Sequence, residues 1–384
     1  MTTQQDETSA SPPPQWVSWL IALVPVLPPL YLASFSRLRD LASIPQSAKY
    51  LIGGFLLTQL ISTAFTDNPV LSLLLIGLHS FLILSLIAVG LYLKSSIYVF
   101  PIIYGQVFII ISSWIFTILE NVNLLNRLSG PYYHSVSLGF TAALFVWLVY
   151  YSDKGLIFKI SMIIIALITL LATGSRGAAL ALITGFIGAI LKRNLRFIFF
   201  AFLCILLLLP VMSRGNSVIF DHISGRGLSH RDVVWAEALS SWKKNPIGGV
   251  GLYQAGPHIT QLMVGGCSLT QAAEIAGASC PKSLEAFISA NLTAHNLVIN
   301  QGLSTGIIGL LGFLVLFIYF ARQIILTDSP LPNAILFGYT FMNIFDVTVI
   351  LPTLHYGELF WVFCGFTFLI RSKKNNKNIA NMAA

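Results

Sequence analysis

The stretch GLIFKISMIIIALITLLATGSRGAALALITGFIGAIL, residues 155–191, decides the fold class. It contains two apolar runs, 155–172 and 177–191, joined by a short connection that carries Arg176. Runs of about 17–25 apolar residues can cross the hydrocarbon core of a bilayer as α-helices. Because neither run alternates apolar with polar residues, helices are favoured over the strands of a membrane barrel. The stretch therefore predicts two neighbouring transmembrane helices with an arginine at the turn between them.

Apolar runs recur along the chain, whose 384 residues are 56 % hydrophobic and 9 % charged. Soluble domains carry about 25 % charged residues, so the composition excludes a soluble protein. The runs lie at 16–34, 49–65, 69–93, 97–117, 135–151, 155–172, 177–191, 196–212, 304–321, 333–351 and 354–370. We expect an all-α polytopic membrane protein with about 11–12 transmembrane helices. Pro25, Pro28 and Pro29 interrupt the first run, which is expected to be kinked or re-entrant. An even number of spans, with both ends inside, is the alternative.

The cationic residues divide unevenly between the two sides of this arrangement. Fourteen of the 22 Lys and Arg residues fall on one side when the spans alternate: Arg37, Arg39, Lys49, Lys94, Lys154, Lys159, Lys192, Arg193, Arg196, Arg322, Arg371, Lys373, Lys374 and Lys377. Short cytoplasmic loops are enriched in Lys and Arg, so this side is predicted to be the cytoplasm. The same distribution accounts for the net charge of +8 without a nucleic-acid partner. The N-terminus then lies outside and does not resemble a signal peptide.

Four regions follow from the spans and the charges. Residues 1–212 are expected to form an N-terminal bundle of about eight spans, and 213–303 a large helical loop on the outer side. Residues 304–371 contain the C-terminal spans, and 372–384 form a basic cytoplasmic tail. The loop is long enough to escape the charge rule, so its cations do not contradict the orientation.

The outer loop is predicted to contain an amphipathic helix that begins near Ser229 and ends at Lys243 and Lys244. Ser229 and Asp232 have the spacing of a helix start, and Val234, Trp235, Ala238, Leu239 and Trp242 fall close together on one face. Asn245-Pro246 ends the helix, and the run from Gly248 to Gly251 follows. Glycines allow sharp turns and close approach of a ligand, so Gly249 and Gly251 are candidate substrate-binding residues. A second helix, 283–302, is expected at the membrane interface before the next span.

Two arginines are candidates for binding an anion. Arg176 lies between Ser175 and Gly177 at the outer end of two spans, where a charge is costly unless it is paired, hydrated or functional. A guanidinium suits phosphate, and the small neighbours allow close approach. A snorkelling arginine that caps a helix is the alternative for Arg176. Arg231 lies near the start of the loop helix, where an anion is also favoured, with a solvated surface residue as its alternative.

Several other polar residues lie where chemistry or pairing is plausible. His295, just before an apolar span and next to Asn296, is a candidate base for a hydroxyl proton, although a lone histidine is more often structural. Asn296 and Asp346 are candidate substrate-binding residues. Asp346 lies in the outer half of a span and needs a partner, for which Arg176 or Arg231 would serve. His79 is interpreted as a hydrogen-bonded core residue. His355 and Glu358 share a face and either pair or line a cavity.

The remaining motifs limit the cofactors. The chain has no Walker A loop, CxxC pair, HExxH or Asp-x-Asp sequence, so neither ATP nor a metal nor any other cofactor is expected. Cys204 and Cys364 lie inside apolar runs and are expected in the core. Cys267 and Cys280 lie in the outer loop, where a disulfide is predicted, and two unrelated loop residues are the alternative.

Three segments resemble the O-antigen ligase family, which also includes related O-antigen polymerases. They are LATGSRGAALALITGFIGAI at 171–190, SHRDVVWAEALSSWKKNPIGGVGLY at 229–253 and AHNLVINQGLSTGIIGLLGFLVLF at 294–317. Their order and the size of the loop also agree with the family. The likeness extends over about 170–320, and the spans before it are similar by hydropathy alone. Many ligases carry a second histidine two positions before the His-Asn step, where this chain has Thr293.

The resemblance implies a type C glycosyltransferase fold in the bacterial inner membrane, with an active site that faces the periplasm. Its donor would be a glycan on undecaprenyl diphosphate, and its acceptor lipid A-core or another lipid-linked glycan. By position, Arg176 and Arg231 would hold the diphosphate, and His295 would be the general base or position the acceptor. Metal-independent transfer of O-antigen to lipid A-core is the expected activity.

Three alternatives remain open at this point. A polymerase that joins lipid-linked repeat units would use nearly the same chemistry, and Thr293 gives this interpretation more room. A pilin-directed oligosaccharyltransferase is less well supported because the second histidine and an added C-terminal domain are missing. A transporter of lipid-linked sugars would carry charged residues along a path through both leaflets, whereas the candidates here gather at one face.

Overall fold

The computed structural model describes residues 16–24, 28–66, 68–91, 96–119, 127–129, 135–212, 231–259, 293–351 and 356–368. Within these ranges the regular structure is helical, and none of the described residues forms a strand. The N-terminal helices are α1 (Trp16–Leu23), the 3₁₀ helix η1 (Pro28–Ser43), α2 (Gln46–Thr63), α3 (Pro69–Gly90), α4 (Ser96–Leu119), α5 (Ser135–Tyr150), α6 (Leu156–Thr173), α7 (Arg176–Ile190) and α8 (Arg193–Met212). Then follow α10 (Arg231–Lys244), α11 (Gly256–Ile259), α14 (Leu297–Leu326), α15 (Pro330–Phe345) and a last helix, Glu358–Phe368.

The helices confirm an all-α polytopic membrane protein. Five segments of the described chain are long and apolar enough to cross a membrane: α3, Phe100–Leu119 within α4, α6, α8 and α14. The shorter helices α5, α7 and Glu358–Phe368 are also apolar. Most of these helices lie close to the apolar runs of the sequence, because a run without charges in hydrocarbon has to form its hydrogen bonds within its own backbone.

Three predicted boundaries differ from the structure. The run 333–351 is helical only as far as Phe345, where α15 ends, so Asp346 follows the helix instead of lying within it. The first run does not form one span: α1 ends at Leu23, and η1 begins at Pro28. Eight residues of α1 cover only about 12 Å, and the prolines that break the run remove backbone donors. The expected interfacial helix over 283–302 is wrong at its C-terminal end, because residues 293–296 are not helical and α14 starts at Leu297. Residues 283–292 lie outside the described part of the chain.

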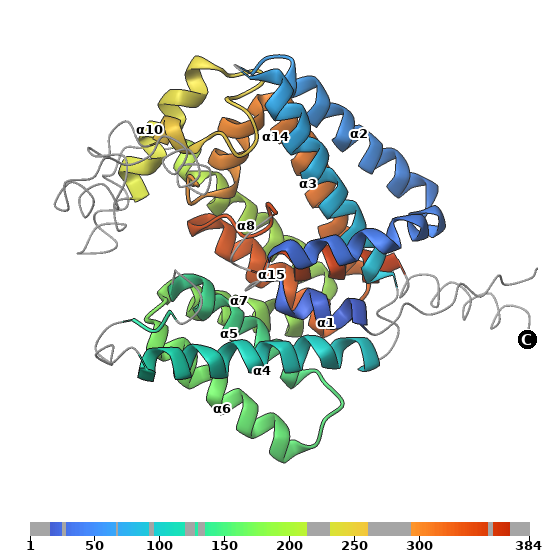
Figure 1. The fold of residues 1–384 in the computed structure, drawn as a ribbon, viewed down its shortest axis with the longest axis vertical. Coiled ribbons are helices and arrows are strands. Elements are labelled where there is room, and N and C mark those ends of the chain that lie inside the picture. The colour runs from blue at the N-terminus through green and yellow to red at the C-terminus, as the bar shows by residue number, and fades with distance from the viewer. Residues whose placement is uncertain are drawn as a thin grey trace, which may run out of the picture.

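The helices pack as several neighbouring pairs around a shared apolar core. In Figure 1, α2, α3 and α14 lie in the upper part of the view and α4, α5 and α6 in the lower part, with α15 between them. Helix α7 packs on α15 and α5, and α10 packs on α14. Phe317 of α14 stacks on Phe360 of the last helix at a centroid distance of 5.4 Å. These contacts hold the N-terminus of α7, the start of α10 and the start of α14 in one folded unit.

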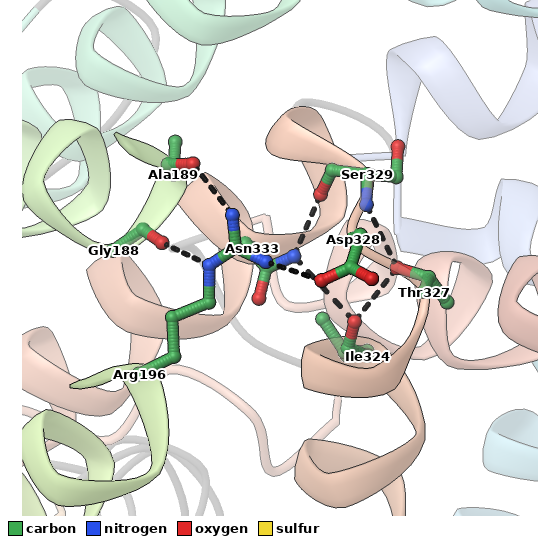
Figure 2. Close-up of polar contacts among 8 residues, drawn as sticks. All are labelled: Gly188, Ala189, Arg196, Ile324, Thr327, Asp328, Ser329 and Asn333. Atoms are coloured by element: carbon green, nitrogen blue, oxygen red, sulfur yellow. Dashed lines mark hydrogen bonds and ion pairs between the residues drawn. The ribbon is translucent and has the colours of Figure 1, made fainter. Parts of the chain in front are cut away.

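An arginine staple holds the predicted cytoplasmic end of α7. Arg196, at the start of α8, is buried and donates from Nε to the Gly188 carbonyl at 3.0 Å and from Nη2 to the Ala189 carbonyl at 2.9 Å. Its Nη1 lies 3.2 Å from Oδ1 of Asp328, in the connection between α14 and α15 (Figure 2). The last carbonyls of a helix carry partial negative charge, so the cation satisfies them while Asp328 balances it. Asn333 secures the same connection by donating to the Ser329 carbonyl at 2.7 Å.

Candidate functional site

The turn between α6 and α7 presents Arg176. Helix α6 ends at Thr173, and Gly174 turns the chain in the left-handed conformation with φ of 62°. Ser175 is buried and caps α7 by accepting from the Ala178 amide at 3.3 Å. Arg176 is the first residue of α7 and is exposed. Ser175 therefore serves the helix itself, while the guanidinium of Arg176 is available to an external group.

Gly177 faces α15 with room for a small side chain. A Cβ atom placed on Gly177 would lie 3.7 Å from Sδ of Met342, an ordinary packing distance. The packing of α7 on α15 therefore does not require glycine at position 177, and the role of Gly177 in binding substrate stays a prediction. Met342 is one turn before Asp346, so this contact also sets how the arginine end of α7 lies relative to the acidic end of α15.

Arg231 is the first residue of α10 and is half-buried. Its Nε is buried and has no hydrogen-bond partner among the described residues. Burial lowers the pKa of the Arg231 guanidinium, the carboxylate of Asp346 raises it and the charge of Arg176 lowers it. Both Asp346 and Arg176 are therefore within electrostatic reach of Arg231. The structure thus gathers three of the predicted site residues from α7, α10 and the end of α15.

The inner face of α10 holds it against the start of α14. Val234, Trp235, Ala238 and Leu239 are buried in one cluster with residues of α14, as the amphipathic pattern predicts. Lys243 and Lys244 close the helix as expected. Ser229, the predicted cap, lies outside the described residues. This packing fixes the direction in which Arg231 leaves the helix.

His295 and Asp346 form the polar contact at the centre of the site. Nδ1 of His295 lies 3.2 Å from Oδ1 of Asp346, and the same oxygen accepts from the Val347 amide at 2.9 Å. A carboxylate can only accept, so Nδ1 of a neutral His295 carries the hydrogen and Nε2 has the lone pair. The His295 side chain is 34 % exposed, whereas that of Asp346 is 3 % exposed. The buried carboxylate therefore orients a ring whose reactive nitrogen can reach a substrate.

His295 has an unusual backbone conformation, with φ of 49°. Non-glycine residues adopt positive φ rarely, and such strain gathers at functional sites. Asn300 holds the segment by accepting from the Ala294 amide at 3.0 Å. Asn296 holds the other side as the cap of α14 and accepts from the Val298 and Ile299 amides. The strained residue is thus fixed on both sides.

Asn296 is occupied by the protein itself. Its Nδ2 donates to the Leu207 carbonyl of α8 at 3.2 Å and to the Ile344 carbonyl of α15 at 3.1 Å. With its oxygen accepting two amides, all the usual hydrogen bonds of the buried amide group are made. We therefore correct the sequence-based interpretation of Asn296: its side chain joins three helices and is not free to contact a substrate.

The glycine-rich turn closes a break in α14. Gly306 has φ of 62° and ψ of −169° inside this helix. The Val250 and Gly251 amides donate to the Leu303 and Ser304 carbonyls at 2.8 and 2.9 Å. In return, the Ile307 amide donates to the Pro246 carbonyl at 2.9 Å. The turn and the broken helix thereby exchange backbone hydrogen bonds.

This exchange changes the interpretation of Gly249 and Gly251. A Cβ atom on Gly249, whose φ is 71°, would lie 2.4 Å from the Leu303 carbonyl oxygen. The Gly249 amide donates to the Asn245 carbonyl, and the Gly251 amide to Ser304. The sequence correctly indicates a close backbone approach, but the approaching partner is α14. The two residues are therefore not part of the substrate site that we propose below.

Two other polar residues considered in the sequence, His79 and Glu358, are buried, and neither takes part in the contact between His295 and Asp346. His79 of α3 is 1 % exposed, but neither ring nitrogen has a hydrogen-bond partner among the described residues. The interpretation of His79 as a core residue is right, but its expected hydrogen bonds are absent from the described structure. Its ring lies edge-on to Tyr253 at a centroid distance of 6.0 Å. Glu358 is also fully buried, and His355 lies outside the described residues.

Two of the four cysteines lie in the described part of the chain. Cys364 is buried and Cys204 is half-buried, and neither forms a disulfide. Cys267 and Cys280 lie outside the described part of the chain, so their pairing stays a prediction. No group of at least three His, Cys, Asp or Glu residues that would suit a metal occurs within the described ranges.

Sequence reasoning did not identify Asn300 or Gly306 as determinants of the site. A signal for Asn300 is present, since it follows Asn296 by one helical turn and would face the same junction. A signal for Gly306 is harder to read, because glycine inside an apolar span is common in membrane helices.

Comparison with known proteins finds one family that matches part of the chain. A family described as O-antigen ligase matches residues 160–314. No curated protein matches the chain. The matched range contains the α6–α7 turn, α10, the glycine-rich turn and the start of α14, while Asp346 lies beyond it. This family implies an enzyme of the glycosyltransferase or ligase type that acts on lipid-linked glycans in a membrane. The match over residues 160–314, which carry Arg176, Arg231 and His295, supports assigning this part of the chain to the O-antigen ligase family.

Proposed function

We propose that the protein transfers a glycan from undecaprenyl diphosphate to lipid A-core on the periplasmic side of the bacterial inner membrane. One contact carries this proposal: Asp346 lies 3.2 Å from His295, and both Asp346 and Arg176 are within electrostatic reach of Arg231. Four groups from separate segments of the chain therefore converge. This supports a site in which two cations suited to phosphate act together with a histidine that accepts a proton.

Arg176 and Arg231 bind the diphosphate in this proposal. When the bond from the sugar to the diphosphate breaks, negative charge develops on the leaving oxygen. Guanidinium groups that are already in place stabilise this charge without reorganising, and partial burial strengthens their effect. Nε of Arg231, which has no hydrogen-bond partner in the described part of the chain, is one donor that the leaving group would engage.

His295 activates the acceptor. An acceptor hydroxyl attacks the anomeric carbon while its proton passes to Nε2 of His295. The bond from the anomeric carbon to the diphosphate oxygen breaks, and undecaprenyl diphosphate leaves with the bonding electrons. Asp346 stabilises the imidazolium that forms and keeps the ring in its tautomer. A single displacement inverts the anomeric centre.

We propose that this chemistry requires neither a nucleotide nor a metal. The two arginines supply the positive charge that a metal ion would otherwise place on the diphosphate. The donor needs no activation by a nucleotide, because it already carries its leaving group. A chelator should leave the transfer rate unchanged in purified protein. A rate that falls with EDTA and recovers with one divalent cation would contradict this part of the proposal.

The outward orientation of the site is supported by the two ends of α7. Arg176 begins this helix, and its last carbonyls lie against Arg196. The 15 residues of α7 extend about 22 Å, which is most of the hydrocarbon thickness. Lys192 and Arg193 are exposed near Arg196. The excess of cations at that end favours the cytoplasm there and the periplasm at Arg176.

Reconstitution tests the proposed reaction. Purified protein in vesicles is supplied with an undecaprenyl diphosphate glycan and with lipid A-core, and the products are identified by mass. Arg176→Ala, Arg231→Ala and His295→Ala should each reduce transfer by about 10²-fold or more. Arg322→Ala is the matched control, because Arg322 is exposed at the other end of the bundle. Full transfer by Arg231→Ala would refute the diphosphate role of this residue.

A polymerase is the second candidate, since Thr293 stands where many ligases have a second histidine. The same reconstitution distinguishes the two functions when lipid-linked repeat units replace lipid A-core. Product in which one repeat is joined to another, without attachment to lipid A-core, would identify a polymerase. Movement of the donor across the vesicle without a glycosidic product would instead indicate a transporter.

A further inference from the structure

Arg127 lies beside the turn that carries Arg176, although the two residues are far apart in sequence. The Leu128 amide donates to the Ala172 carbonyl, in the last turn of α6, at 3.1 Å. The Leu128 side chain is buried with Ile109 and Leu138. These contacts fix the backbone next to Arg127 against the outer end of α6.

The Arg127 side chain runs along Gly174. A Cβ atom placed on Gly174 would lie 3.5 Å from Nε of Arg127 and 3.7 and 3.8 Å from its Cγ and Cδ. The start of the guanidinium is therefore in packing distance of the residue that precedes Ser175 and Arg176. Arg127 and Arg176 are both exposed, so each can reach a group outside the protein.

The partners of Arg196, at the predicted cytoplasmic end, differ from those of the three outer arginines, Arg127, Arg176 and Arg231. Arg196 has two carbonyls and the carboxylate of Asp328 around it. Within the described residues, the ion pairs join Arg37 to Asp40, Arg196 to Asp328 and His295 to Asp346. None of them includes an arginine of the outer turn or the first arginine of α10.

Such a gathering of cations is costly when nothing balances it. Asp346 stabilises the charge of Arg231 and Arg176 opposes it, while the same aspartate also contacts His295. Arginines near a membrane that lack carboxylate partners suit a phosphate group, which they bind by parallel hydrogen bonds. A diphosphate carries at least two negative charges and has more oxygen atoms than two guanidinium forks occupy.

We infer that Arg127 is a third diphosphate-binding residue, which acts with Arg176 from the same turn while Arg231 acts from α10. This inference rests on the proposed function. It adds a recognition property: the site distinguishes a lipid diphosphate from a lipid monophosphate, because three guanidinium groups are needed only for the larger anion.

Binding of the carrier lipid without a glycan tests the inference apart from catalysis. Purified full-length protein in nanodiscs is titrated with undecaprenyl diphosphate and with undecaprenyl monophosphate. Arg127→Ala should weaken diphosphate binding about 10-fold, the size expected for one charge-assisted contact, and monophosphate binding less than about 3-fold. Arg127→Lys should recover part of the loss, because it keeps the charge but not the fork. Arg322→Ala should bind both lipids as the unchanged protein does.

The outcomes separate the inference from the proposed function. If Arg176→Ala loses diphosphate binding while Arg127→Ala does not, Arg127 is outside the site and the proposed function stands. If the unchanged protein does not prefer diphosphate to monophosphate, the selectivity is refuted. If it binds neither lipid, the proposed donor is wrong as well. Arg127→Gln provides a second neutral variant should Arg127→Ala fold poorly, as judged by its melting temperature.

Discussion

Nδ1 of His295 and Oδ1 of Asp346 lie 3.2 Å apart, and they join the start of α14 to the end of α15. The histidine comes from a strained junction, while the aspartate is anchored by the Val347 amide. The contact therefore links a partly exposed ring to a buried carboxylate. This relationship makes Asp346 a positioning residue rather than a group that contacts substrate.

Asp346→Asn should lower kcat by about 10²-fold while the KM for the donor changes little. The amide keeps the shape of the carboxylate but cannot stabilise the imidazolium. If its NH2 group faces Nδ1 of His295, it favours the tautomer in which the hydrogen is on Nε2, which cannot accept a proton there. The measurement is transfer kinetics at varied donor concentration. Asp346→Glu should retain more activity than Asp346→Asn. Equal loss in both variants, with a lowered melting temperature, would instead indicate that Asp346 is needed only for folding.

Gly306→Ala should destabilise the protein severely, by more than about 3 kcal/mol. Its Cβ atom would lie 2.0 Å from the Ile247 carbonyl oxygen, and the backbone φ of 62° disfavours any side chain. Thermal melting in detergent measures the effect. Gly77→Ala in α3 is the matched control: no atom comes within 4 Å of its added Cβ, so it should change stability by less than about 1 kcal/mol.

Asn296→Ala should reduce both stability and transfer. The Leu207 and Ile344 carbonyls lose their side-chain donor, and the first amides of α14 lose their cap. Each buried group left without a partner costs about 1–3 kcal/mol. Asn296→Asp restores the cap but not the donors, so melting temperatures should rank the Asp variant between Ala and Asn. A fully stable and active Ala variant would contradict the joining role of Asn296.

His79→Leu should leave stability unchanged or raise it. Both ring nitrogens are buried without partners in the described structure, so removing them takes away a desolvation penalty. Gln59→Leu is the control, because Gln59 donates to the Gly309 carbonyl at 2.8 Å and its loss should lower the melting temperature. If His79→Leu destabilises the protein as much as Gln59→Leu, then a bound hydroxyl or water satisfies His79 in the membrane.

The helices were largely predictable because hydrocarbon selects long apolar runs. The first run was not predictable as one span, because its prolines divide it between α1 and η1. The start of α14 was placed too late, since the polar residues before 304 indicated a separate helix at the membrane interface over 283–302. In the structure, Asn300 and Gln301 lie in α14 and are buried within the protein instead.

The candidate site was predictable where single residues stand out chemically. An arginine in a tight turn between apolar runs and a histidine at the start of a span are conspicuous, and both lie in the site. The role of the glycine-rich turn was not predictable, because its partner is a helix break more than fifty residues later. Nothing in the sequence singles out Arg127, since its approach to Gly174 depends on how the chain packs.

The backbone exchange between the glycine-rich turn and α14 also bears on biogenesis. The ribosome makes the turn before it makes α14, yet the Val250 and Gly251 amides find their acceptors only in that later helix. A break in a helix at membrane depth needs protein partners for its freed carbonyls. The two segments must therefore mature together, and a chain truncated before Leu297 should display a protease-sensitive outer segment even after the earlier helices have been inserted.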